Sequence, residues 1–195
     1  MKNLVVFASG SGSNFQSIID AVSNKQLQAN ISGLVSNNDT CFALERAQKN
    51  AIPTFSINPN TFENEADYCK QLLDQLDIWN ADVLILAGYL RKIPEEIIAK
   101  FPNRILNIHP SLLPAYGGKG FYGKKVHQAV IENNEIESGC SVHIVTTEYD
   151  EGPVLGQSKV QLSENETAES LATKVLQQEH LLFPKVIQQH LNTLK

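Results

Sequence analysis

The chain has 195 residues, of which 42% are hydrophobic and 19% charged, and its formal net charge is −5 at pH 7. This length fits one globular domain over residues 1–195. The acidic balance argues against nucleic-acid binding, which usually requires a basic patch, and no apolar run is long enough to span a membrane. The three cysteines are far apart and form no C-x-x-C pair, which indicates a reduced, cytoplasmic protein without a metal site.

Short β-rich runs alternate with helical patterns along the chain. Strands are predicted at 4–8, 31–35, 52–57, 82–87, 104–109, 141–146 and 154–160. Helices are predicted at 14–22, 42–48, 66–79, from 94, at 126–132 and near the C-terminus. The last helix should follow a capping box at Ser163 and Glu166, and Pro184 should break or kink it.

This alternation predicts an α/β fold with a doubly wound, mostly parallel sheet and helices on both faces. Pro53 marks the third strand as an edge strand, because proline cannot donate a ladder hydrogen bond. In such folds, ligands bind beyond the carboxyl ends of the strands, near a topological switch point. We therefore expect functional residues directly after the strands.

A glycine-rich loop, S-G-S-G-S-N at 9–14, follows the first predicted strand. Its glycines allow close backbone approach, and the next helix offers free N–H groups, so Gly12, Ser13 and Asn14 are candidate ligands of a phosphate. Phe15 occupies the third position of a dinucleotide fingerprint, and no G-K-[ST] follows. One phosphate is therefore expected rather than a pyrophosphate. The alternative is a polar turn that only caps the helix.

Asn107 and His109 lie two residues apart in a predicted buried strand, so their side chains should point to the same side. Histidine exchanges protons near neutral pH, and asparagine donates hydrogen bonds to carbonyl oxygen. This pair suits acyl transfer through an oxyanion. Pro110 and Pro114 stiffen the following loop, which makes it a good support for a site. A histidine satisfied by the protein core is the alternative.

Asp150 lies in an acidic loop after a later strand, where it could orient a nearby histidine and favour its protonated form. Glu148 and Glu151 are competing candidates, and their spacing does not decide among the three. A solvated acidic loop is the alternative.

Together, these stretches closely resemble the phosphoribosylglycinamide formyltransferase family. The matching stretches, in the family's order, are the loop at 9–14, A-G-Y-L-R at 87–91, N-I-H-P-S-L-L-P at 107–114, G-C-S-V-H at 139–143, D-E-G-P at 150–153 and Q-E-H at 178–180. They span nearly the whole chain.

The resemblance implies a single Rossmann-like formyltransferase domain, a monomer or homodimer, that moves the formyl group of 10-formyltetrahydrofolate to glycinamide ribonucleotide without a metal. It implies catalytic roles for Asn107, His109 and Asp150. The implied acceptor contacts are Gly12, Ser13, Asn14 and Glu179, and the implied folate contacts are Leu90, Arg91, Lys92, Ile93 and Asn107. In the hypothetical mechanism, Asn107 and protonated His109 stabilise the oxyanion.

Two departures from the family pattern concern binding. Many relatives place an arginine for the folate just before the third helix, where this chain has Glu63-Asn64-Glu65. The segment 117–125 is a longer glycine- and lysine-rich loop, either a mobile flap over anionic substrate or a plain surface loop. A formyltetrahydrofolate hydrolase is the alternative function. A dinucleotide-dependent oxidoreductase and a non-catalytic nucleotide sensor are more distant possibilities.

Overall fold

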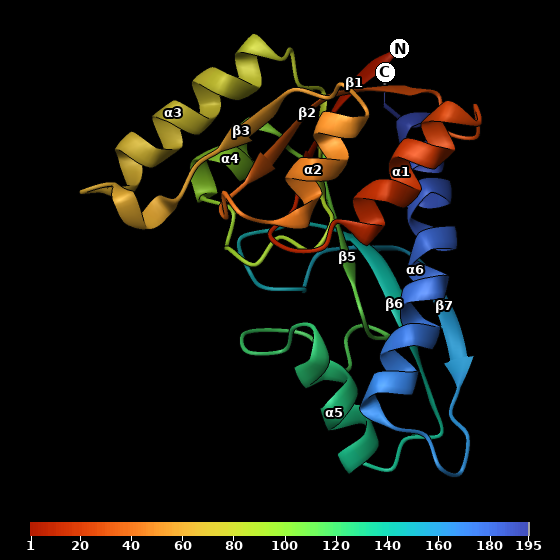
Figure 1. The fold of residues 1–195 in the computed structure, drawn as a ribbon. Helices are drawn as coiled ribbons and strands as arrows, with labels where there is room; N and C mark the ends of the chain where they lie inside the picture. Colours follow the sequence, from red (N-terminus) through yellow and green to blue (C-terminus); the bar gives the residue numbers. More distant parts are fainter. Residues whose placement is uncertain (195) are drawn as a thin grey trace. The chain divides into compact units, whose positions relative to one another are not determined.

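The computed structural model describes residues 1–194 and divides into two compact units, Met1–Leu106 and Asn107–Lys195. Both units combine strands and helices, which confirms the predicted α/β class (Figure 1). The prediction of one domain over 1–195 stays a prediction. None of the helices in the described part of the chain is long and apolar enough to cross a membrane.

The first unit is a parallel sheet with the strand order β3-β2-β1-β4. β5 (Ile105–His109) begins in this unit, where the Leu84 N–H donates to the Arg104 carbonyl at 2.8 Å. The other elements are β1 (Lys2–Phe7), α1 (Ser13–Ser23), β2 (Ala29–Ser36), α2 (Phe42–Lys49), β3 (Thr54–Ser56), the 3-10 helix η1 (Pro59–Thr61), α3 (Glu65–Ile78), β4 (Val83–Leu86) and α4 (Glu95–Lys100).

The topology of this unit explains its buried core and positions its loops. From β1 the chain winds outward to β2 and β3, and then returns to β4 on the other side of β1. Right-handed crossovers therefore place α1 and α2 on one face of the sheet and α3 and α4 on the other. β1 and β4 are covered on both faces, which explains their unbroken apolar runs. The switch point lies between them, where the loops after β1 and β4 are expected to bind ligand.

The second unit has the strand order β5-β6-β7, in which β6 (Glu137–Ile144) and β7 (Val154–Gln161) are antiparallel. Their register shifts between Val142 and His143, and such a bulge changes the direction of a side chain. α6 (Ala168–Leu191) runs beside β6 and β7 and also packs against α5 (Lys124–Glu132) (Figure 1). Phe183 and Ile187 are fully buried on its inner face.

The expected start of α6 is wrong. The Ser163 N–H does donate to the Glu166 side chain at 3.2 Å, but the Ser163 hydroxyl donates to the same carboxylate, and the N-cap is Thr167, in a capping box with Ser170. Of the break or kink expected at Pro184, the break is absent, because the helix continues to Leu191. Proline lacks one helical N–H, but the helix retains a buried apolar face around that position, and packing outweighs the local penalty.

Candidate active site

The loop after β1 ends at a helix N-terminus that no side chain caps. Gly12 has a left-handed backbone (φ +68°) and precedes α1, whose first turn has no side-chain cap. From α2, the Arg46 side chain donates to the Ser11 carbonyl at 2.8 Å and to the Gln16 side chain at 3.0 Å. Phe15 is fully buried, as expected of a core residue rather than a pyrophosphate contact. An uncapped helix N-terminus with a braced glycine loop suits an anion.

We expect Gly12→Ala to destabilise the protein by about 3 kcal/mol, because it adds left-handed strain and overpacking. A Cβ at Gly12 would lie 2.8 Å from the Ala43 Cβ. Gly10→Ala is the matched control, since nothing lies within 4 Å of its added Cβ. Urea unfolding measures both variants. An equal free energy of unfolding for the two would contradict the requirement for glycine at position 12.

The loop after β4 (residues 87–94) is tied to the glycine loop through Ser9. The Leu90 N–H donates to the Ser9 hydroxyl at 2.9 Å, and the Ser9 N–H donates to the Gly88 carbonyl at 3.1 Å. Arg91 and Lys92 are exposed, and Leu90 is 62% exposed, so these side chains are accessible to a ligand. Ile93 is only 2% exposed.

The segment Glu63-Asn64-Glu65, where many relatives have an arginine, leads into the start of α3 in this chain. The Asn64 side chain accepts the Asp67 N–H at 2.9 Å and caps α3, and Glu65 lies in the first turn, where a negative charge favours the helix dipole. Further along α3, Tyr68 and Tyr89 are buried with their hydroxyls 3.2 Å apart. This pair fixes the 87–94 loop against α3.

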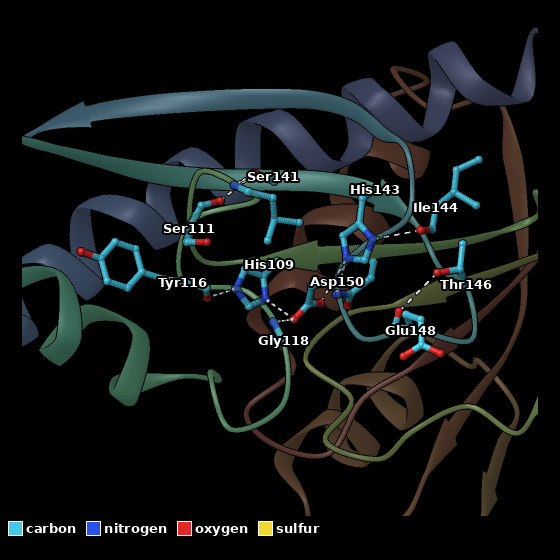
Figure 2. Close-up of polar contacts among 12 residues, drawn as sticks. His109, Ser111, Tyr116, Gly118, Ser141, His143, Ile144, Thr146, Glu148 and Asp150 are labelled. Carbon is cyan, nitrogen blue, oxygen red and sulfur yellow. Dashed lines mark hydrogen bonds and ion pairs between the residues drawn. The ribbon is translucent and has the colours of Figure 1, made fainter.

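The end of β5 places Asn107 and His109 in the second unit. A turn that contains Ser111 follows His109 (Figure 2). The Ser141 hydroxyl on β6 donates to the Ser111 carbonyl at 2.6 Å and accepts the Leu113 N–H at 2.9 Å. Buried hydrogen bonds of this kind fix the chain directly beyond His109. The expectation of a rigid support is met by this network as well as by the two prolines.

Asp150 is the acid that lies beside His109. Its Oδ2 is 3.5 Å from the His109 Nδ1 and accepts the Gly118 N–H at 3.0 Å (Figure 2). Glu148 and Glu151 are exposed, so the structure distinguishes among the three candidates. Asp150 adopts a left-handed backbone (φ +58°), which aspartate tolerates better than most residues.

His109 is held as a neutral imidazole at neutral pH. Its Nε2 lies 2.8 Å from the Tyr116 carbonyl, and because a carbonyl only accepts, Nε2 carries the proton. Burial lowers the His109 pKa from 6.5, and it outweighs the Asp150 charge, which acts to raise it. The sequence interpretation expected Asp150 to favour the protonated form, but the 4% exposure of His109 makes desolvation the larger effect.

The carboxyl of Asp150 is held below its ordinary pKa, so it is ionised at neutral pH. Burial acts to raise the pKa, but contacts with His143, with His109 and with the Gly118 N–H more than offset it. A carboxylate therefore lies beside two buried imidazoles.

His143 is the site residue that sequence reasoning did not assign. It is 2% exposed, and its Nε2 lies 3.0 Å from the Asn107 Nδ2 and 3.4 Å from the Asp150 Oδ1 (Figure 2). The available signal was a histidine at the carboxyl end of a buried strand, the same pattern that identified His109. Without the fold, nothing indicated that the ends of β5 and β6 lie close together.

Glu179 lies on α6 in the same unit and is buried. Burial of the Cys140 thiol raises its pKa to about 12, and the charge of Glu179 adds to this shift. All three cysteines are free and buried. Within residues 1–194, no cluster of histidine, cysteine, aspartate or glutamate could hold a metal ion.

The fold and these contacts define an α/β protein with an amide, two imidazoles and a carboxylate gathered beyond strand ends, the groups that acyl transfer uses. The family model "Formyl transferase" matches residues 2–187. The phosphoribosylglycinamide formyltransferase of Escherichia coli (strain K12) is 37% identical over 185 residues, which cover 95% of this chain and 85% of that protein.

The chloroplastic phosphoribosylglycinamide formyltransferase of Arabidopsis thaliana is 44% identical over 95% of this chain, which spans 64% of that protein, less than two thirds of its length. The crystal structure of phosphoribosylglycinamide formyltransferase from Bacillus halodurans is similar with a TM-score of 0.92 and 32% identity, covering 98% of this chain and 96% of that one. The chain belongs to the formyl transferase family, within its phosphoribosylglycinamide formyltransferase branch.

Proposed function

We propose that this chain transfers the formyl group of 10-formyltetrahydrofolate to the amine of 5'-phosphoribosylglycinamide, a step of purine biosynthesis, in the cytoplasm. The observation that carries the proposal is the contact of Asp150 with His109, beside Asn107, in a chain that matches the formyl transferase model over residues 2–187. The names of the relatives supply the particular donor and acceptor.

The geometry supports a proton route that starts from neutral His109. The amine attacks the formyl carbon, and an Asn107 N–H donates to the developing oxyanion. The amine's proton passes to the His109 Nδ1, the ring nitrogen without a proton, directly or through a water. Asp150 stabilises the resulting imidazolium, since its Oδ2 faces Nδ1 at 3.5 Å. His109 then gives this proton to the departing folate nitrogen, so the proton count balances.

The binding roles rest on the loops of the first unit and on α6. The uncapped start of α1 suits the acceptor's phosphate, with Gly12, Ser13 and Asn14 as its contacts. Leu90, Arg91, Lys92, Ile93 and Asn107 are proposed to bind the folate, and Glu179 the acceptor.

The test is a spectrophotometric assay with 10-formyl-5,8-dideazafolate as donor, with and without glycinamide ribonucleotide. Deformylation that requires the acceptor supports formyl transfer. Deformylation without acceptor would instead indicate the formyltetrahydrofolate hydrolase activity. No reaction from folded protein would contradict both functions for this donor.

The loop at 117–125 is proposed to be a flap over anionic substrate. Residues 119–125 are all exposed, and they include Lys119, Lys124 and Lys125. Deleting residues 119–122 keeps the Gly118 N–H that donates to Asp150. The deletion should raise the KM of the phosphorylated acceptor about tenfold, because one charge-assisted hydrogen bond contributes about that factor. Steady-state kinetics measure this. Unchanged KM values for both substrates, in a variant of unchanged Tm, would leave only a surface loop.

A further inference from the structure

His143 makes three contacts through two ring nitrogens (Figure 2). Its Nδ1 is 2.9 Å from the Ile144 carbonyl, and its Nε2 is 3.0 Å from the Asn107 Nδ2 and 3.4 Å from the Asp150 Oδ1. The register shift between Val142 and His143 lies at the point where the ring turns toward these groups. The 2% exposure of His143 leaves water little access to replace any contact.

The contacts determine where the proton of a neutral His143 lies. The Ile144 carbonyl can only accept, so Nδ1 carries the proton and Nε2 keeps its lone pair. The lone pair of the neutral ring accepts from the Asn107 N–H, whereas a hydrogen bond to the ionised Asp150, which is also an acceptor, requires the protonated ring. Nε2 can serve only one of these neighbours, and the shorter contact is the one to Asn107.

We propose that His143 is a positioning residue that fixes the amide of Asn107 so that its second N–H remains the donor for the formyl oxygen. The side-chain amide torsion of asparagine has two broad, nearly equivalent orientations. In the reversed orientation, Oδ1 would face Nε2, and two lone pairs would repel. Neutral His143 therefore selects one orientation. The catalytic part of this inference rests on the proposed formyl transfer.

Asp150 depends less on His143 than Asn107 does. Its Oδ2 accepts the Gly118 N–H at 3.0 Å and faces His109, and these contacts remain when His143 is replaced. Loss of His143 should therefore affect stabilisation of the oxyanion rather than proton transfer. Both KM values should change little, because Asn107 acts mainly on the transition state.

Two variants and one spectrum of the unaltered protein test the proposal. His143→Leu removes the acceptor and should lower kcat about 100-fold, the cost of a misplaced catalytic group. His143→Gln places an oxygen acceptor at similar reach, and it should recover most of that turnover. In the 15N NMR spectrum of the wild-type protein, the His143 Nε2 should lack a proton and show a coupling across a hydrogen bond to the Asn107 Nδ2.

Asn107→Ala should abolish that coupling and leave the His143 proton on Nδ1. A proton on Nε2 in the wild-type spectrum would overturn the proposal, whatever the activity. Equal kcat values for folded His143→Leu and wild type, or equal losses in the Leu and Gln variants, would also overturn it. Failure of the wild type to transfer formyl would contradict the proposed function instead, and the NMR result would still decide the contact.

Discussion

Replacing His109 by alanine is expected to lower kcat about 10³-fold, within the range that general acid–base catalysis contributes. His109 is buried, and in its neutral form Nδ1 faces Asp150 while the Nε2 proton binds the Tyr116 carbonyl. The other imidazole nitrogen that faces this carboxylate in the described contacts, the His143 Nε2, is engaged by the Asn107 side chain. The KM values should change little, because the binding loops lie elsewhere in the chain.

The assay with 10-formyl-5,8-dideazafolate measures this loss, and His127→Ala is the matched control. His127 is also a buried histidine of the second unit, on α5, and its pKa is likewise lowered by burial. Its removal should cost stability but little turnover. A similar loss of kcat in both variants, or near-normal turnover of His109→Ala, would contradict the role assigned to His109.

The polar residues at the end of β5 were predictable because the two-residue repeat of a strand depends only on residues adjacent in the sequence. The alternation of Asn107 and His109 correctly indicated one side of a buried strand. The glycine loop was predictable for the same reason, since it does follow β1 and lead into α1. The structure agrees with sequence reasoning at these two places, whereas the capping box expected at Ser163, also a local pattern, lies four residues further on.

Choice among the three acids required the loop's conformation. The 145–153 loop closes on itself, with the Ile144 N–H donating to the Pro153 carbonyl at 2.9 Å. A Cβ at Gly152 would lie 1.8 Å from the Ile144 carbonyl oxygen, so only glycine fits there. These contacts direct Asp150, and not Glu148 or Glu151, toward His109, and no spacing rule contains them.

The protonation state of His109 also depends on burial, which the motif does not report. Sequence reasoning weighed the nearby carboxylate, which raises the pKa of a histidine. The structure adds desolvation, which is the larger effect and lowers it. The same limitation explains why His143 was not assigned, because its role arises from contacts between β5, β6 and the loop that carries Asp150.

Asp150→Asn should lower kcat about 10²- to 10³-fold, because the amide no longer stabilises the imidazolium formed at His109. It should also move the acid limb of the pH profile. His109 must be neutral to accept a proton, so activity is lost as pH falls through its pKa, which lies below 6.5. Asp150 acts to raise that pKa, and removing its charge should shift the limb to lower pH.

The pH dependence of the stability of Asp150→Asn distinguishes the contribution of Asp150 from that of His109. The lowered pKa of Asp150 contributes stability above 3.8, which is lost as pH falls through the folded value. The lowered pKa of His109 makes its protonation unfavourable to the fold below 6.5. Urea unfolding against pH should therefore show that Asp150→Asn loses the Asp150 part of the lower-pH dependence, while the part from Glu137 and Glu166 and the upper dependence remain. If activity were instead lost as pH rises through the His109 pKa, protonated His109 would be the reactive form and the proposed proton route would be wrong.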